Sequence, residues 1–181
     1  MKVVIIDYRM GNIHSVARKL KILGVDHEIS NNPDTIIQAD KLILPGVGHF
    51  GKAMLQLEET NLIPILNDVV LNQKKPIMGI CLGMQLMANF SEEGNVNGLG
   101  WIDGKVKRFQ VNDKLRFKIP HTGWNQIKVC KENTMNRGLN NESEFYFVHA
   151  YYFQAMEEKD VLHKTTYEQE FVSAIQKDNI V

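Results

Sequence analysis

The N-terminal half of the chain alternates short apolar runs with segments of helical periodicity. The runs Val3–Asp7 and Lys41–Leu44 predict buried strands, and the apolar spacing in Ile13–Leu23, closed by Gly24, predicts an amphipathic helix between them. The other elements predicted here are a strand at His27–Ser30, a helical turn at Thr35–Ala39, a long helix over Phe50–Asn72 broken near Pro64, a strand at Pro76–Ile80 and an apolar helix at Leu82–Phe90. Such alternation is typical of βαβ units, so we expect a parallel sheet covered on both faces.

The C-terminal half has a different pattern, because from Gly100 onward strand-like runs follow one another with few helical stretches between them. These runs are Lys105–Phe109, Asn125–Val129, Phe145–Phe153 and Phe171–Ile175. We expect them to extend the sheet with antiparallel strands at its edge. A length of 181 residues with 44% hydrophobic content suits one sizeable core, so residues 1–181 are predicted to form a single α/β domain.

Charge and cysteine usage narrow the class of partners. Lys and Arg total 21, as do Asp and Glu, so the overall balance carries no electrostatic footprint for nucleic acid. The 2 cysteines belong to no C-x-x-C or Cys/His cluster, which argues against a metal centre and suits a reducing cytoplasm. The apolar run from Val3 leaves no room for a signal peptide, and no apolar stretch approaches the roughly 18 residues of a membrane span. We therefore expect a cytoplasmic protein that acts on a small molecule or another protein, with no membrane or nucleic-acid partner.

A glycine-rich loop follows the predicted strand Lys41–Leu44. Residues 46–51 have the form G-x-G-x-x-G, which is formally the dinucleotide-binding pattern. That pattern needs an acidic residue about twenty positions further on, at the end of the next strand, whereas Asp68 falls inside a helical pattern. The alternative is a loop that exposes backbone N–H groups toward a developing negative charge, which glycines permit by removing side-chain bulk.

A second turn, Gly79-Ile80-Cys81-Leu82-Gly83, follows the next predicted strand and has the form G-x-nucleophile-x-G. A strand that turns sharply into a helix strains the residue at its tip, so small neighbours are needed. We expect the Leu82 N–H to face an oxyanion and the helix N-terminus to lower the pKa of the Cys81 thiol. The plain alternative is a buried cysteine, and this is the interpretation for Cys130, which has no glycine neighbours.

Four motifs together carry a family resemblance: PGVGHFG, GICLGMQ, KIPHTGWN and YFVHAYY, in this order. They resemble the triad class I glutamine amidotransferases and, within them, the glutaminase subunits of imidazole glycerol phosphate synthase. The resemblance extends from DYRMGN at residues 7–12 to the last residues of the chain. The expected fold class is an α/β, flavodoxin-like open sheet with a parallel core, antiparallel edge strands and helices on both faces.

The resemblance implies an enzyme in which Cys81 attacks the carboxamide carbon of glutamine. A glutamyl thioester would form with release of ammonia, and water would then release glutamate. The implied oxyanion-hole residues are Gly46, Val47, Gly48 and Leu82. The implied substrate-binding residues are Gln85, Ala150 and Tyr151. Family members often carry serine where Ala150 stands, so any contact from that hydroxyl is lost here, and no cofactor or metal is implied.

The resemblance also implies a heterodimer with a (β/α)8 barrel synthase, to which ammonia passes without meeting bulk water. The acceptor reaction would be the cyclase step of histidine biosynthesis. The positions that would face this partner are Tyr8, Met10, Gly11, Asn12, Lys118, Pro120, His121, Gly123, Trp124 and Asn125. Without the family, the histidine and tryptophan of this set would belong to an ordinary turn.

The sequence departs from the family at its end. The family takes its general base from a His-Pro-Glu sequence near the C-terminus, and this chain has no His-Pro pair. After the strand Phe171–Ile175 and a polar turn, Ile180 and Val181 resemble the start of a returning strand. We therefore expect a domain shortened at its C-terminus that hydrolyses glutamine poorly, with His149 as an alternative base.

Three alternatives remain open. A paralogous subunit could feed ammonia to a partner that amidates a surface-polysaccharide sugar, to which the segments 91–101 and 174–180 are slightly more similar. A catalytically silent binding subunit could keep the partner surface without the base. A cysteine hydrolase or redox protein could share only the nucleophile turn.

Overall fold

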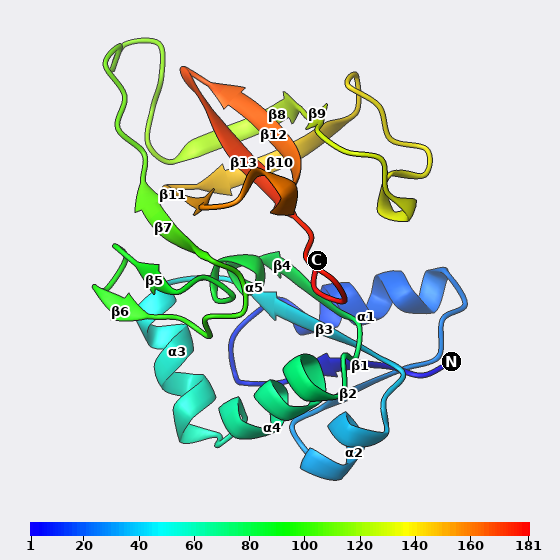
Figure 1. Cartoon of the computed structure of the whole chain (residues 1–181). Helices are drawn as coiled ribbons and strands as arrows, with labels where there is room; N and C mark the ends of the chain where they lie inside the picture. Colours follow the sequence, from blue (N-terminus) through cyan, green and yellow to red (C-terminus); the bar gives the residue numbers. More distant parts are fainter.

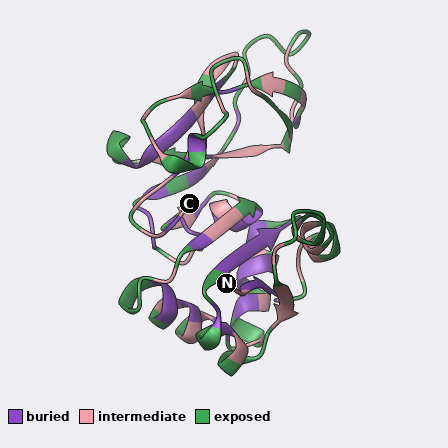
Figure 2. Ribbon diagram, turned by 90° about the vertical axis from the view of Figure 1, so that its right-hand side faces the viewer, coloured by how far each residue is buried: buried purple, intermediate pink, exposed green.

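A four-stranded parallel sheet in the order β2-β1-β3-β4 forms one layer of the computed structural model, which describes residues 1–181 (Figure 1). Its strands are β1 (Val3–Ile6), β2 (His27–Ser30), β3 (Lys41–Gly46) and β4 (Ile77–Cys81). Successive side chains along a strand point to opposite faces of the sheet, and both sets are apolar and buried along β1. The buried strands are visible in the lower part of Figure 2.

Helices cover both faces of this sheet, as the alternating pattern predicts. They are α1 (Ile13–Ile22), α2 (Pro33–Gln38), α3 (Phe50–Glu59), α4 (Ile63–Asn67), a π-helical turn (Asp68–Asn72) and α5 (Leu82–Gln85). The apolar stripe of α1 covers the small cluster Val3, Ile5 and Ile43. The opposite face of the sheet packs in a cluster of 26 buried residues, which also includes residues of the second layer of the molecule, described next.

Mostly antiparallel strands form the second layer, whose later strands lie at the top of Figure 1 and whose first two lie lower, at the left. They are β5 (Phe90–Ser91), β6 (Val96–Asn97), β7 (Gly104–Arg108), β8 (His121–Gln126), β9 (Lys128–Val129), β10 (Glu144–His149), β11 (Tyr151–Ala155), β12 (Val161–Tyr167) and β13 (Gln169–Ile175). Seven of them form a sheet in the order β6-β5-β7-β11-β13-β12-β9, and β8 and β10 form a separate two-stranded ribbon. The predicted fold class is confirmed, with the detail that these strands build sheets of their own.

Two helix ends differ from the prediction. The long helix breaks after Glu59, and Pro64 lies in the first turn of α4, where its missing N–H is harmless. Helix α5 ends at Gln85 instead of Phe90, because the next carbonyls are used by a later segment. Leu86 O accepts from Leu99 N–H at 2.8 Å, and Met87 O and Ala88 O accept from residues 100–102.

Strand boundaries differ as well. The predicted strand Phe145–Phe153 is two strands that part at Ala150 and enter different sheets, and Asn125–Val129 likewise divides between β8 and β9. Strand β12 was not predicted, because its sequence VLHKTTY lacks a clear alternation of apolar and polar residues.

The last residues lie beside β4. Val181 N–H donates to Ile77 O at 2.9 Å, and Val181 O accepts from Gly79 N–H at 2.7 Å. The bridge between Ile77 and Ile180 is parallel and isolated, so Ile180 and Val181 lie along the edge of β4 without forming a strand of their own.

Candidate active site

Cys81 occupies the turn from β4 into α5 in a left-handed backbone conformation, with φ 57° and ψ −114°. Such a conformation is strained for a residue with a side chain and is typical of functional turns. The side chain reaches solvent. The structure therefore favours an accessible nucleophile over a buried cysteine.

The glycines on both sides of Cys81 are required by close packing. A Cβ at Gly79 would lie 2.6 Å from Met84 N, and a Cβ at Gly83 would lie 1.8 Å from Leu44 O. A larger residue at Gly79 would push α5 away from β4, and one at Gly83 would push the turn away from β3. The predicted need for small neighbours is thus explained by contacts with α5 and β3.

The pKa of the Cys81 thiol differs from the prediction. Surrounding protein atoms desolvate the thiol and raise its pKa, while a hydrogen bond from the Leu82 N–H opposes this shift. Helix α5 is only one turn long, so its N-terminus contributes little to the thiolate. In the unliganded site Cys81 is therefore held as a thiol, and a base is needed to activate it.

The glycine loop after β3 lies beside this turn, because Gly46 is paired directly with Cys81 in the parallel register. Gly48 has φ +102°, a conformation that favours glycine, and Val47 is exposed into the same cavity as Cys81. Leu82, the fourth predicted oxyanion residue, follows Cys81 with a buried side chain. The structure thus brings Gly46, Val47 and Leu82 close to Cys81, and Gly48 follows Val47 in the same loop.

Tyr8 holds the start of this loop. Its side chain is 0% exposed, and its hydroxyl donates to Pro45 O at 2.7 Å. Burial and the nearby Cys81 raise the pKa of Tyr8, so the hydroxyl stays protonated and keeps donating. The prediction of a partner contact for this side chain is wrong, because a fully buried ring offers no surface to a partner.

Glu93, which the sequence did not single out, holds the other end of the loop. Its carboxylate accepts from Phe50 N–H at 2.8 Å, and His49 Nδ1 accepts from Gly51 N–H at 3.1 Å. Both donors belong to the N-terminus of α3, where a bound pyrophosphate would need them. This arrangement excludes the dinucleotide interpretation of residues 46–51. Only the tertiary fold places Glu93 here, since 43 positions separate it from Phe50.

The predicted substrate-binding residues also meet. Gln85 Nε2 donates to Tyr151 O at 3.0 Å, which links α5 to β11. Ala150 is half-buried at the crossing between β10 and β11, and its carbonyl accepts from Phe109 N–H at 3.0 Å. Gln85 lines, together with Cys81 and His149, a largely apolar cavity of about 630 Å³.

The ribbon of β8 and β10 carries the KIPHTGWN motif and has one apolar face. Trp124 (69% exposed) and Tyr146 (55%) are paired in register, and Val148 (60%) lies on the same face. Met10, Gly11, Gly123 and Asn125 are half-buried, whereas Asn12, Lys118 and Pro120 are exposed.

His121, on the other face of this ribbon, is only 3% exposed. The prediction of a partner contact for its side chain is therefore wrong. The alternation of a strand explains this, because His121 and Trp124 differ by an odd number of positions and point to opposite faces.

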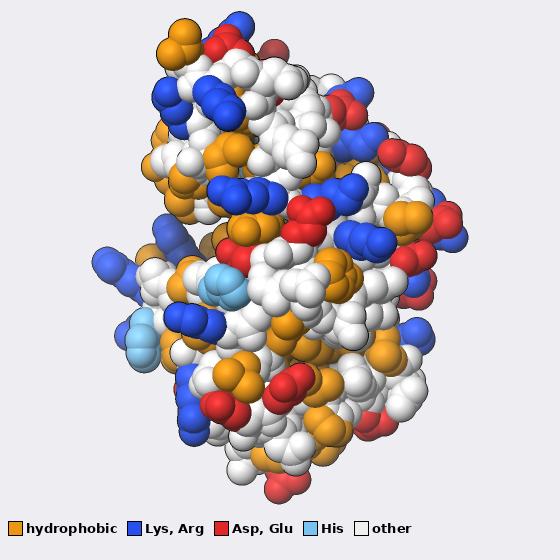
Figure 3. Space-filling model, turned by 90° about the vertical axis from the view of Figure 1, so that its left-hand side faces the viewer, with side chains coloured by type: hydrophobic (Ala, Val, Ile, Leu, Met, Phe, Trp, Pro, Cys, Tyr) orange, Lys and Arg blue, Asp and Glu red, His pale blue; other side chains and the backbone are white.

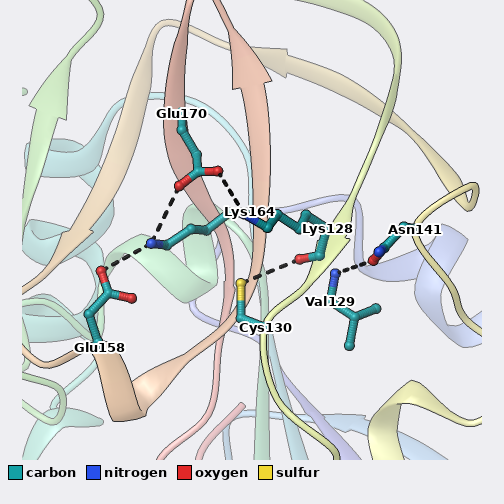
Figure 4. Close-up of polar contacts among 7 residues, drawn as sticks. All are labelled: Lys128, Val129, Cys130, Asn141, Glu158, Lys164 and Glu170. Atoms are coloured by element: carbon teal, nitrogen blue, oxygen red, sulfur yellow. Dashed lines mark hydrogen bonds and ion pairs between the residues drawn. The ribbon is translucent and has the colours of Figure 1, made fainter.

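Cys130 lies in a different environment (Figure 4). The prediction that it is a buried core cysteine is wrong, because the residue is exposed beside the short edge strand β9. Its sulfur donates to Lys128 O at 3.5 Å, close to an ion-pair group in which Lys164 Nζ is 3.0 Å from Glu158 and 3.4 Å from Glu170. Burial raises the pKa of its thiol, a shift that Lys164 opposes. Cys130 lies outside the cavity that Cys81 lines and has no oxyanion donors arranged around it.

Charged side chains of both signs are interspersed on the face shown in Figure 3, with no single-sign field. The side chains form no group of three or more His, Cys, Asp or Glu with the arrangement of a metal site. None of the helices has the length and apolar character that a membrane crossing requires.

The fold and the strained cysteine turn together define the class of protein. Residues 4–181 match the family described as glutamine amidotransferase class-I, and the chain belongs to this family. Two solved structures share the fold. One, described as a glutamine amidotransferase, has a TM-score of 0.74 at 17% identity and covers 98% of this chain and 86% of its own. A glutamine amidotransferase from Thermotoga maritima has a TM-score of 0.66 at 13% identity, with coverages of 99% and 73%.

Curated relatives are more similar in sequence. The chain is 48% identical over 178 residues to imidazole glycerol phosphate synthase subunit HisH 2 of Methanococcus maripaludis, covering 98% of this chain and 87% of that protein. It is 46% identical over 179 residues to subunit HisH 1 of Campylobacter jejuni, with coverages of 98% and 88%. It is 43% identical over 178 residues to subunit HisH 2 of Pseudomonas aeruginosa, with coverages of 98% and 87%.

Proposed function

We propose that this chain is a glutaminase subunit that releases ammonia from glutamine for an imidazole glycerol phosphate synthase. The observation that carries the proposal is the strained turn of Cys81 paired with Gly46, which presents an accessible nucleophile beside backbone donors. The names of the HisH relatives supply the acceptor reaction. The cytoplasm is the expected compartment for such a biosynthetic step.

The chemistry follows from the positions around the sulfur. The thiolate of Cys81 attacks the glutamine carboxamide, and the negative charge that develops on oxygen is met by backbone N–H groups of residues 46–48 and Leu82. The proton that the thiol gives up is returned to the leaving nitrogen, so ammonia leaves as the thioester forms, and water then releases glutamate and the free thiol. Gln85 and the Ala150–Tyr151 segment hold the polar end of the substrate, with backbone groups replacing the hydroxyl that Ala150 lacks.

His149 does not serve as the base. It lines the same cavity, but Nδ1 is 2.8 Å from Tyr151 O and Nε2 is 3.0 Å from His121 Nδ1, so both ring nitrogens are engaged. The only hydrogen bond that shifts the pKa of Cys81 comes from the Leu82 backbone. We therefore propose that residues 1–181 bind glutamine but turn it over slowly unless a base reaches the site.

The partner is proposed to be the (β/α)8 barrel subunit of the synthase. Trp124, Tyr146 and Val148 form an exposed apolar face on a two-stranded ribbon, and an exposed aromatic pair of this kind is typical of protein interfaces. Amidation of a surface-polysaccharide sugar is not favoured, since the HisH relatives named above carry the histidine-pathway name.

The test is covalent labelling of Cys81 by a chloroketone analogue of glutamine, read by peptide mass. We expect a single label, on Cys81. Glutamine should protect Cys81 from the analogue, and aspartate, which has a shorter side chain, should not. Iodoacetamide serves as the control reagent for general thiol access, and Cys130 serves as the internal comparison. Equal labelling of both cysteines, with no protection by glutamine, would contradict the proposal and favour a silent subunit.

A further inference from the structure

Two histidines on the β8–β10 ribbon face each other inside an aromatic cluster. His121 and His149 are directly opposite in register, and His121 Nδ1 lies 3.0 Å from His149 Nε2. His121 stacks on Tyr167, with ring centroids 4.0 Å apart, and on Phe147 at 5.1 Å. Neither histidine is used by the thioester chemistry described above.

The positions of their protons follow from the partners. Tyr151 O can only accept, so His149 Nδ1, 2.8 Å away, must carry a hydrogen. In a neutral ring Nε2 of His149 is then an acceptor, and His121 Nδ1 must donate to it. His121 Nε2 is left as an acceptor, and the Asn125 amide lies 3.4 Å from it as a donor.

Both rings are neutral near pH 7. Burial, followed by the proximity of His149, lowers the pKa of His121 to about 4. Burial also lowers the pKa of His149, which the bond to Tyr151 O opposes. The ring partners of His121 are Phe109, Phe147, Tyr167, Phe171 and His149 itself, and no carboxylate is among them. The directions of the hydrogen bonds are thus fixed under ordinary conditions.

The chain of hydrogen bonds ends at the nucleophile helix. Tyr151 O accepts from His149 Nδ1 and also from Gln85 Nε2 at 3.0 Å, so both of its acceptor positions are filled. Gln85 lies one helical turn after Cys81 on α5. At its other end the chain of hydrogen bonds reaches His121 on β8, the strand that also carries Trp124 and Asn125.

We propose that His121 and His149 are positioning residues, whose one-way hydrogen-bond chain links the β8 surface to the Tyr151 carbonyl and Gln85. The chain fixes the orientation of the Tyr151 peptide and of the Gln85 amide beside the glutamine cavity. A shift of β8, such as a partner docked on Trp124 would cause, is transmitted through the two rings to that cavity. The glutamine half of this inference rests on the proposed function, whereas the hydrogen-bond chain does not.

The first test measures the tautomers by NMR of the full chain with 15N-labelled histidine. Both rings are expected in the Nδ1–H form, which is the minor form of free histidine. His121→Phe keeps the aromatic packing but removes the donor to His149 Nε2. The 15N chemical shift of that nitrogen should then move toward the value of a nitrogen that accepts no hydrogen bond, while His149 stays in the Nδ1–H form that Tyr151 O requires. His121→Asn retains a donor near the Nδ1 position and should leave the His149 Nε2 shift close to that of the unchanged chain.

The second test measures how strongly glutamine protects Cys81 from iodoacetamide. His149→Gln removes the donor to Tyr151 O and should weaken protection about five- to tenfold, the effect of one hydrogen bond. His149→Asn keeps a donor near Nδ1 and should stay within about twofold of the unchanged chain. His121→Phe, which touches no substrate, should weaken protection as His149→Gln does. The alkylation rate without glutamine should be the same in the three variants and the unchanged chain.

The outcomes separate the two proposals. Nε2–H tautomers in the unchanged chain, or a His149 Nε2 shift that ignores His121→Phe, would overturn the hydrogen-bond chain. Equal protection in His149→Gln and His149→Asn would overturn its role in glutamine binding. If glutamine gave no protection to the unchanged protein, the proposed function would be overturned. The NMR measurement would still test the hydrogen-bond chain independently.

Discussion

Gly46 at the end of β3 is paired directly with Cys81 at the end of β4. This pairing places the loop that follows one parallel strand against the nucleophile turn that follows the next, at the edge where open α/β sheets build their sites. The contact leaves no room for a side chain, since a Cβ on Gly46 would lie 2.7 Å from Tyr8 Oη and 2.8 Å from Gly83 N. The geometry of the site is therefore set by the register of the sheet.

Gly83→Ala should destabilise the fold and displace the nucleophile turn. Its Cβ would lie 1.8 Å from Leu44 O, a backbone atom that moves only with β3, so we expect a loss of about 3 kcal/mol or more in the free energy of unfolding by urea. Gly51→Ala is the matched control, because its Cβ would come no closer than 3.4 Å, to a side chain, in helix α3. A Gly83→Ala protein as stable as the control would refute the crowding argument.

Tyr8→Phe should loosen the glycine loop. The change removes the hydroxyl that donates to the buried Pro45 carbonyl at 2.7 Å, and we expect a loss of about 1–2 kcal/mol in the free energy of unfolding. The rate of Cys81 labelling by the chloroketone analogue should fall as well, because the loop is proposed to supply oxyanion donors. Tyr167→Phe, whose exposed hydroxyl bonds Lys118 O, should have a smaller effect on stability and none on labelling. Equal effects of the two changes would contradict a special role for Tyr8.

The parallel core and the cysteine turn could be predicted from sequence because local patterns encode them. The strands β1, β3 and β4 are rich in apolar residues, and the two glycines on either side of Cys81 indicate a crowded turn. The antiparallel layer was harder to predict, because one apolar run is divided at Ala150 between two sheets. Only tertiary contacts determine at which residue the run is divided.

Long-range contacts also limit what the sequence reveals about the site. Glu93 reaches Phe50 N–H across 43 positions, with no local signal to announce it. The burial of Tyr8 and His121 follows from the layers packed over them, which a motif does not describe. The motifs therefore indicated which segments meet, while the direction of their side chains was not always predictable.

Stability should fall as the solution is acidified through the range set by His121. Its pKa is about 4 in the folded protein against an ordinary value of 6.5, so the unfolded chain binds the proton first. The contribution of neutral His121 to the free energy of unfolding is constant above about pH 6.5 and is lost progressively between about pH 6.5 and about pH 4. Urea unfolding at several pH values measures this loss, and His121→Phe should flatten the dependence. His149 and His163 also have lowered pKa values, so part of the slope should remain. An unchanged slope in His121→Phe would contradict the assignment.

Trp124→Ala should weaken assembly with a synthase barrel without unfolding the chain. The side chain is 69% exposed and contacts Tyr146, so its loss should leave stability nearly unchanged while raising the Kd for the barrel about tenfold or more. Leu115→Ala is the control, because Leu115 is 92% exposed but lies outside the ribbon. Titration of each variant with the barrel subunit gives the Kd. Equal binding by both variants would place the interface elsewhere.

A base supplied along the free edge of β4 should activate Cys81. Val181 is hydrogen-bonded to Ile77 and Gly79, and Ile180 is bridged in parallel to Ile77, so a segment added after Val181 along the same edge would reach the level of Cys81 within about two residues. We predict that a chain continued past Val181 with a segment containing His-Pro-Glu hydrolyses glutamine about a hundredfold or more faster than residues 1–181, the usual contribution of a positioned base. The same extension with alanine in place of the histidine is the control. Because both extensions occupy the same edge of β4, only proton transfer distinguishes them, and equal turnover would show that the thiol is activated from within residues 1–181.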